Sequence, residues 1–183
     1  MREFNTTKRV IAVFGTARDH DKALLAKANQ VGQLIARAGG AVLCGGGDGV
    51  MGAVADGAVK AGGEAYGFNI KLPFEQFARP SLTDYVEFET FGERLEAFAR
   101  TADAFIVMGG GYGTVLELYF MVQLMQVGHI KRKPIILTEE WLLDTTLTLD
   151  ESLLIKGFIS HDDFGLVGFD FNLASAVSTA MGE

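Results

Sequence analysis

The stretch from residue 104 to residue 117 places the strongest constraint on the fold. Its apolar run AFIVM ends in four glycines within five positions, and a helix-like sequence follows. A continuous apolar run of this length is typical of a strand buried on both faces, as in a parallel sheet. Glycines let the backbone turn sharply and lie close to a bound group, and the first amides of the next helix favour an anion. The stretch therefore predicts a phosphate-binding loop with the carboxylate of Glu117 beside it. The residues of this loop are Gly110, Gly111, Tyr112, Gly113 and Thr114.

Strand-like and helix-like segments alternate along the rest of the chain. Predicted strands cover residues 10–14, 41–44, 64–68, 85–88, 103–108 and 133–137. Predicted helices cover residues 24–38, about 53–61, 91–101, 113–127, 140–156 and the residues from 172 onward. This alternation predicts a Rossmann-like, doubly wound α/β fold with a mostly parallel sheet and helices on both faces. Because no internal repeat or linker interrupts the pattern, residues 1–183 are expected to form a single domain.

The overall charge narrows the classes of partner. The formal net charge is −7, which argues against a broad surface for nucleic acid or anionic membrane, and so against a DNA-handling protein. No stretch approaches the ~20 apolar residues that span a bilayer, and the N-terminus lacks the apolar core of a signal peptide. The single cysteine rules out an intrachain disulfide and suits a reducing compartment. A cytoplasmic protein is therefore expected, with no nucleic-acid or membrane partner.

Three of the predicted strands end in glycine or small polar turns, at residues 15–18, 45–52 and 109–114. Ligands of doubly wound sheets bind beyond the carboxyl ends of the strands, where the strand order reverses, so these turns are expected to line one crevice. Residues 47–52 also match G-x-G-x-x-G, which leaves open a dinucleotide site, a tight structural turn, or a loop for phosphate or sugar. The last is favoured, because the motif follows the second strand and no acidic residue stands where a ribose ligand is expected. The predicted binding residues here are Thr16, Gly46, Gly47 and Met51.

Two charged residues stand out from their surroundings. Arg94 falls within the apolar stripe of the helix predicted at 91–101, where a guanidinium requires an anionic partner or a ligand unless it reaches solvent. Glu117 stands three residues after Thr114, and this spacing also fits a capping box, in which the glutamate would only close the helix start. Both alternatives remain open from spacing alone. With an anion at the 110–114 loop, Arg94 and Glu117 would together form a functional constellation.

The helix predicted at 113–127 is apolar nearly all round. Such a helix is typical of a deep core or of an interface, so a homodimer is expected. The three histidines, His20, His129 and His161, are dispersed along the chain and show no metal-ligand spacing. Neither a metal nor a cofactor is predicted.

The motifs at these positions resemble those of the LOG family. GGYGTVLE at residues 110–117 is similar to the family signature P-G-G-x-G-T-x-x-E, and GGGDGVMG at residues 45–52 resembles its second glycine loop. FGER at residues 91–94 resembles its arginine motif, and FNIKLPFEQ at residues 68–76 is similar to a segment of its bacterial members. The likeness extends from about residue 10 to about residue 170.

The resemblance implies a Rossmann-like dimer that hydrolyses the N-glycosidic bond of a nucleoside 5′-monophosphate. The substrate would be AMP or a cytokinin riboside monophosphate, the products free base and ribose 5-phosphate, and the catalytic pair Arg94 and Glu117. The sequence departs from the family motifs at two positions. Gly109 replaces the signature proline. Leu95 replaces the lysine that commonly follows the arginine, and this change removes a positive charge near the expected phosphate. The family's older label, lysine decarboxylase, finds no support, because nothing marks a pyridoxal-phosphate lysine. The alternative function is a non-catalytic carrier of a nucleotide or of a phosphorylated cofactor.

Overall fold

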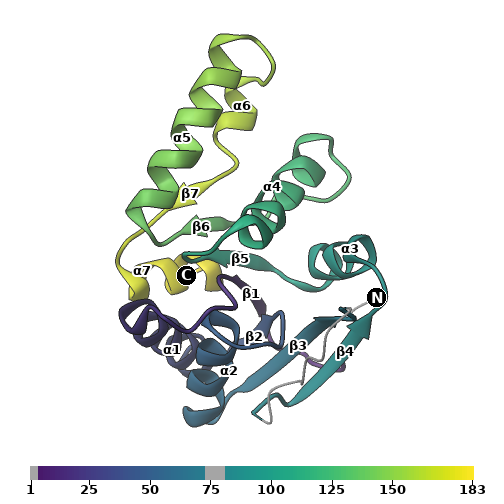
Figure 1. Ribbon diagram of the computed structural model, residues 1–183, viewed down its shortest axis with the longest axis vertical. Coiled ribbons are helices and arrows are strands. Elements are labelled where there is room, and N and C mark those ends of the chain that lie inside the picture. Colours follow the sequence, from purple (N-terminus) through teal and green to yellow (C-terminus); the bar gives the residue numbers. More distant parts are fainter. Residues whose placement is uncertain (1–3, 73–80) are drawn as a thin grey trace.

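A parallel sheet of seven strands forms the centre of the computed structural model, which describes residues 4–72 and 81–183 (Figure 1). The strands lie in the order β4-β3-β2-β1-β5-β6-β7, and every neighbouring pair is parallel. Their bounds are β1 Val10–Phe14, β2 Ala41–Cys44, β3 Glu64–Ile70, β4 Asp84–Phe88, β5 Ala104–Val107, β6 Ile135–Leu137 and β7 Gly168–Phe169. The helices are α1 Lys22–Arg37, α2 Val50–Lys60, α3 Phe91–Thr101, α4 Tyr112–Gln126, α5 Glu140–Ile155, α6 His161–Phe164 and α7 Leu173–Met181. The predicted α/β, Rossmann-like fold is confirmed.

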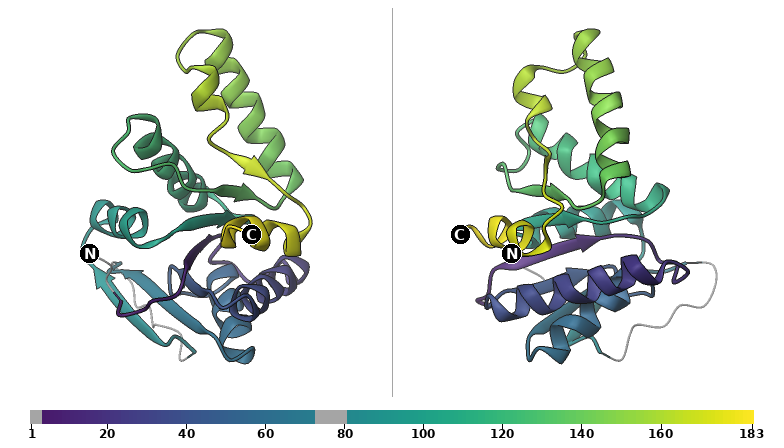
Figure 2. Two further views of the ribbon diagram at one scale, coloured as in Figure 1. Left: turned by 180° about the vertical axis from the view of Figure 1, so that it is seen from behind. Right: turned by 90° about the vertical axis from the view of Figure 1, so that its left-hand side faces the viewer.

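The two faces of the sheet are covered by different helices. Alternate residues of β1 contribute to two apolar clusters, because side chains of a strand point to opposite faces in turn. One cluster joins Ile11 and Val13 to α1, α2 and α7, and the other joins Phe14 to α3, α4 and α5. Figure 2 shows these helices on opposite sides of the sheet. Burial on both faces explains why the central strands are continuous apolar runs.

The strand order reverses between β1 and β5. The chain proceeds outward from β1 through β2, β3 and β4, then returns to place β5 on the other side of β1. The carboxyl ends of β1 and β5 therefore flank the place where such folds bind ligands. These ends are Phe14 and Val107, which lie directly opposite each other in the parallel register.

Several boundaries differ from the sequence-based expectations. α6 and β7 were not expected, and in Figure 1 α5 and α6 extend away from the sheet. β7 has only two residues, both exposed, so no apolar run marked it. α4 begins at Tyr112, earlier than expected. The resemblance noted at residues 68–76 is only partly covered, since residues 73–80 lie outside the described residues.

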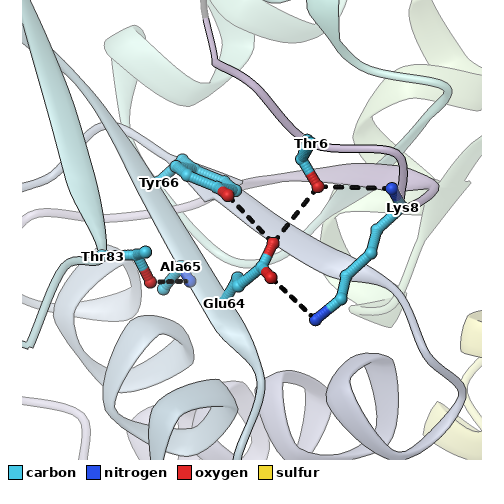
Figure 3. Close-up of polar contacts among 6 residues, drawn as sticks. All are labelled: Thr6, Lys8, Glu64, Ala65, Tyr66 and Thr83. Atoms are coloured by element: carbon cyan, nitrogen blue, oxygen red, sulfur yellow. Dashed lines mark hydrogen bonds and ion pairs between the residues drawn. The ribbon is translucent and has the colours of Figure 1, made fainter.

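The segment before β1 is fastened to the start of β3, as Figure 3 shows. The Glu64 carboxylate accepts hydrogen bonds from the Tyr66 hydroxyl at 2.9 Å and the Thr6 hydroxyl at 3.2 Å, and pairs with Lys8 Nζ at 3.0 Å. Phe4 is buried and stacks on Tyr66, with ring centroids 4.4 Å apart. Charge and aromatic stacking together fix β3 at its amino end, opposite the ligand-binding edge of the sheet.

Candidate active site

The three predicted turns meet through backbone hydrogen bonds at one residue, Thr16. Its N–H donates to the Gly109 carbonyl oxygen at 2.9 Å, and its carbonyl oxygen accepts from the Val50 N–H at 2.8 Å. The turn after β1 is therefore bonded to the turns after both β5 and β2. The expected convergence of the three strand ends is confirmed.

A cavity of about 1350 Å³ opens over these turns. Of the residues predicted for binding or catalysis, those that line it are Thr16, Gly47, Met51, Arg94, Gly110, Gly111, Tyr112, Gly113, Thr114 and Glu117. The exception is Gly46, which is buried behind the loop, with φ of +76°. A β carbon on Gly46 would collide with the side-chain oxygen of Asn69, so this glycine shapes the loop from beneath.

Arg94 is held in place on three sides. Its Nε–H donates to the Phe68 carbonyl oxygen at 2.8 Å, and its Nη2 lies 3.3 Å from Oε1 of Glu117. The guanidinium also lies over the Phe98 ring, 5.5 Å from the centroid. Arg94 is 8% exposed, so it does not reach out to solvent. Of the alternatives that the sequence left open, the structure shows pairing with an acid, and that acid is Glu117 in the cavity wall.

Glu117 does not cap its helix. α4 begins at Tyr112 with Gly111 as N-cap and no described side chain capping it, so Thr114 and Glu117 both lie inside the helix. The capping-box interpretation is therefore wrong. The Glu117 side chain is 12% exposed, and burial raises its pKa to about 7, although the Arg94 charge opposes this rise. A carboxyl group titrating near neutrality in a cleft, beside one specific cation, is typical of functional sites.

The amino end of α4 is open towards the cavity. A β carbon on Gly111 or Gly113 would meet no described atom within 4 Å, so a ligand can approach this backbone closely. A β carbon on Gly110, in contrast, would lie 2.7 Å from Thr114 Cβ and 3.0 Å from Thr16 N. The first amides of an uncapped helix of 15 residues form a site suited to an anion.

The glycine loop after β2 has both a structural and a lining role. Gly49 has φ of +64°, and a β carbon there would lie 2.8 Å from the Arg18 carbonyl oxygen. Gly49 therefore lets this loop pack on the turn after β1, as the structural interpretation of G-x-G-x-x-G required. Gly47 and Met51 line the cavity. At the end of β3 stands Asn69, a buried amide whose Oδ1 atom lacks a hydrogen-bond partner among the described residues.

The two residues that depart from the family pattern, Leu95 and Gly109, lie in different parts of the structure. Leu95 is 4% exposed and packs in the apolar cluster shared by α3, α4 and α5, so its side chain lies in the core and not in the cavity wall. Gly109 is buried at the cavity edge, where a β carbon would lie 3.1 Å from the Leu24 side chain and 3.7 Å from Trp141 Nε1. The neighbours of Gly109 therefore leave little room for a larger residue.

Among the cavity-wall residues that were not predicted as site residues, four have aromatic or basic side chains. Phe91 and Trp141 are exposed aromatic side chains at the starts of α3 and α5, and together with Tyr112 they give the rim three aromatic rings. Arg18 and His20 line the cavity from the turn after β1. Arg18 belongs to the turn predicted at 15–18 and His20 lies two residues beyond it, whereas Trp141 belongs to a helix that nothing in the sequence linked to the site.

Neither metal clusters nor membrane spans occur in the described part of the chain. Within residues 4–72 and 81–183, no three or more histidine, cysteine, aspartate or glutamate side chains are grouped so that they could hold a metal ion. In the same residues, no helix combines the length and the apolar character needed to cross a membrane.

Comparison with known proteins identifies the family of this chain. The family described as "Possible lysine decarboxylase" matches residues 51–179. The cytokinin riboside 5′-monophosphate phosphoribohydrolase LOG2 of Arabidopsis thaliana is 30% identical over 167 residues, which are 87% of this chain and 76% of the relative. The chain belongs to the LOG family. A second member, the cytokinin riboside 5′-monophosphate phosphoribohydrolase of Mycobacterium tuberculosis, is 34% identical over 135 residues, 72% of this chain and 71% of its own.

Solved structures share the fold of this LOG family member. The Moco carrier protein of Chlamydomonas reinhardtii is 26% identical, with a TM-score of 0.69 over 96% of each chain. Relatives named as hydrolases and a structural neighbour named as a carrier thus share one scaffold, as superfolds commonly do. The site, and not the fold, has to distinguish these two activities.

Proposed function

We propose that the protein hydrolyses the N-glycosidic bond of a nucleoside 5′-monophosphate, AMP or a cytokinin riboside monophosphate, to free base and ribose 5-phosphate. One observation carries the proposal. Glu117, with its pKa raised to about 7, lies 3.3 Å from Arg94 in a cavity that also contains the uncapped amino end of α4. The ribose of a nucleoside monophosphate has a phosphate at its 5′ end and the base at C1′. The amino end of α4 is suited to bind the phosphate, and the Arg94–Glu117 pair in the same cavity is suited to act at C1′.

The binding step uses the backbone. Amides of residues 110–114 hold the 5′-phosphate, and Thr16, Gly47 and Met51 shape the remaining nucleotide pocket. Gly111 and Gly113 leave the backbone uncovered, so phosphate oxygens approach it directly. Because the phosphate is fixed at the helix end, the ribose is directed towards Glu117, which lies further along the same helix.

The chemical step breaks the bond between C1′ and the base nitrogen. Positive charge develops on the ribose, and the Glu117 carboxylate stabilises it, as in sugar hydrolysis generally. A water molecule then adds through its oxygen to C1′; one of its protons passes to Glu117 and from Glu117 to the departing base, which restores the carboxylate. A pKa near 7 suits this exchange, because both forms of Glu117 are populated at neutral pH. Arg94 orients the carboxylate and the substrate.

The same proposal includes a homodimer. Large apolar side chains remain exposed on α4 and at the end of α5: Leu116 is 50%, Val127 64% and Ile155 86% exposed. α4 buries Leu118, Met121 and Met125 on its other face, so the helix has both a core face and an uncovered apolar face. Such a face is suited to an isologous contact with a second copy.

A second candidate function is non-catalytic binding of a nucleotide or a phosphorylated cofactor. The likeness to the Moco carrier protein favours it, because the structural match covers 96% of this chain and the two sequences are 26% identical. A carrier uses the anion site at α4 without needing an acid of raised pKa. The hydrolase is preferred because Glu117, with its pKa raised to about 7, stands in the cavity wall, and a carrier does not require such an acid.

The test uses Glu117→Gln, with Glu151→Gln on the exposed face of α5 as the matched control. A panel of nucleoside monophosphates is incubated with each variant, and ribose 5-phosphate is detected by mass. We expect turnover by the wild type and by Glu151→Gln, and a loss of at least about 100-fold in Glu117→Gln without a lower melting temperature. Full activity of Glu117→Gln would remove Glu117 from the mechanism. Tight binding of a phosphorylated ligand without turnover by the wild type would favour the carrier.

A further inference from the structure

The charged side chains that line the cavity differ in whether they already have a partner within the fold. Arg94 is bonded to the Phe68 carbonyl oxygen and paired with Glu117, so its positive charge is already matched by a negative one. Asp21 accepts a hydrogen bond from the first turn of α1 and serves as its N-cap. Arg18 differs, because its guanidinium has no hydrogen-bond or ion-pair partner among the described residues. Within residues 4–72 and 81–183, no contact of the fold uses this cation of the cavity wall.

The backbone that carries Arg18 is nevertheless fixed. The Arg18 N–H donates to the Thr16 hydroxyl at 3.0 Å, which closes the turn. Thr16 is bonded in turn to Gly109 and Val50, and Gly49 packs against the Arg18 carbonyl oxygen. The backbone of this turn is preorganised, so little backbone entropy remains to be lost when Arg18 binds a ligand.

The turn also lies against the anion site. The Thr16 nitrogen lies 3.0 Å from the position of a β carbon on Gly110, so the turn touches the start of the 110–114 loop. Arg18 is two residues further along and lines the same cavity as Gly111, Tyr112 and Gly113. Arg18 and the open amides of α4 therefore line one ligand space.

A phosphate monoester needs more positive charge than the helix supplies. It carries about −1.5 to −2 at neutral pH, whereas a helix amino end is equivalent to about +0.5. The lysine that would follow Arg94 in the family pattern is Leu95 here, and Leu95 is buried in the core. A guanidinium binds phosphate with two parallel hydrogen bonds, which makes arginine suited to supply this charge.

We infer that Arg18 holds the phosphate of the ligand from the turn after β1, opposite the amides of α4. The inference deepens the proposed function and rests on its phosphorylated ligand, but not on turnover. It assigns the positive charge of the phosphate site to the turn after β1, because position 95 of α3 packs in the core and not in the cavity wall.

The test measures binding of ribose 5-phosphate by calorimetry, because this ligand has the phosphate but no bond to cleave. The variants are Arg18→Gln and Arg18→Lys, and the control is Arg37→Gln, an exposed arginine in the last turn of α1. We expect Arg18→Gln to weaken binding about tenfold to a hundredfold, Arg18→Lys to restore part of it, and Arg37→Gln to change nothing. In turnover assays with AMP, Arg18→Gln should raise KM and leave kcat nearly unchanged.

The outcomes separate this inference from the proposed hydrolase. Equal affinity of Arg18→Gln and Arg37→Gln for ribose 5-phosphate would overturn the role of Arg18, whatever the activity. Failure of the wild type to bind ribose 5-phosphate would overturn it as well, even if the protein released base from a nucleoside. Binding that depends on Arg18, without release of base from any nucleoside monophosphate, would support the role of Arg18 and reject the hydrolase.

Discussion

The Nε–H of Arg94 donates to the carbonyl oxygen of Phe68 at 2.8 Å, which ties the guanidinium of α3 to the backbone of β3. Because the guanidinium is planar, this bond also sets the direction of its outer nitrogens, and Nη2 lies 3.3 Å from the Glu117 carboxylate. The packing of Phe68 against Phe98 and Phe88 holds the carbonyl in position.

This arrangement predicts that Arg94→Lys is not a conservative change. A lysine carries one compact ammonium group and cannot satisfy the Phe68 carbonyl and the Glu117 carboxylate with the same fixed geometry. We expect kcat to fall at least about 100-fold while the protein remains folded, as when one preorganised donor is lost. Arg100→Lys, in the exposed last turn of α3, is the control. Wild-type kcat in Arg94→Lys would show that only the charge at this position matters.

Activity should depend on pH through Glu117. Burial raises its pKa to about 7, and the proposed mechanism uses the carboxylate form. kcat/KM should therefore fall as the pH drops below about 7, approaching a tenfold loss per pH unit. Removal of the Arg94 charge in Arg94→Gln should move the acidic limb of the profile upward, because the arginine lowers the pKa. A profile unchanged in Arg94→Gln would contradict the coupling of the two groups.

Stability should depend on pH with the opposite sign. The ordinary value for this carboxyl is 4.5 and the folded value is about 7, so the folded state binds a proton that the unfolded state lacks between these limits. Glu117 therefore costs stability above pH 7, and the cost disappears as the pH falls towards 4.5. The fall in melting temperature between pH 5 and pH 8 should be a few degrees larger in the wild type than in Glu117→Gln. Calorimetric scans at the two pH values measure the difference.

Neighbouring glycines in the anion loop should respond differently to the same substitution. Gly110→Ala places a methyl group against Thr114 and 3.0 Å from the Thr16 nitrogen, whereas Gly111→Ala meets no described atom within 4 Å. We expect Gly110→Ala to lower the melting temperature by several degrees and abolish activity. Gly111→Ala should keep the melting temperature and raise KM, because its methyl group enters the ligand space. Equal melting temperatures for both variants would refute the crowding at Gly110.

The proposed homodimer predicts a mass of twice the chain in light scattering after size exclusion. Leu116→Glu introduces a charge on the exposed apolar face of α4 and should shift the protein to a monomer. Gln30→Glu, at an exposed polar position of α1 on the other side of the sheet, should leave the dimer intact. A wild type that elutes as a monomer at micromolar concentration would reject the interface.

Much of the fold followed from the sequence because its physical signals were local. β1 and β5 are buried on both faces, and continuous apolar runs marked them. β7 gave no such signal, since it consists of two exposed residues whose place depends on pairing with β6. The start of α4 was predicted within one residue, but the spacing of Thr114 and Glu117 also suggested a capping box, although Gly111 precedes the helix and no such box forms.

The candidate site was predictable only in part, because contacts between distant segments complete it. The glycine loops could be recognised from their clustered glycines, and Arg94 could be recognised as a charged residue within an apolar stripe. Helical spacing placed both Leu95 and Arg94 on the apolar stripe of their helix, but it did not show that residue 95 packs in the core while residue 94 lies in the cavity wall. Trp141 enters the cavity wall only because α5 starts beside Gly109 in the folded chain.

The bonds at Thr16 have a dynamic consequence. Its N–H is bonded to the turn after β5, and its carbonyl oxygen to the amide of Val50 after β2. Opening any one of the three turns therefore requires breaking a bond to another, so the turns should open in concert. A ligand that binds only to the α4 amides should therefore also slow deuterium uptake at the amides of Thr16 and Val50, although both amides are bonded to neighbouring turns and not to the ligand.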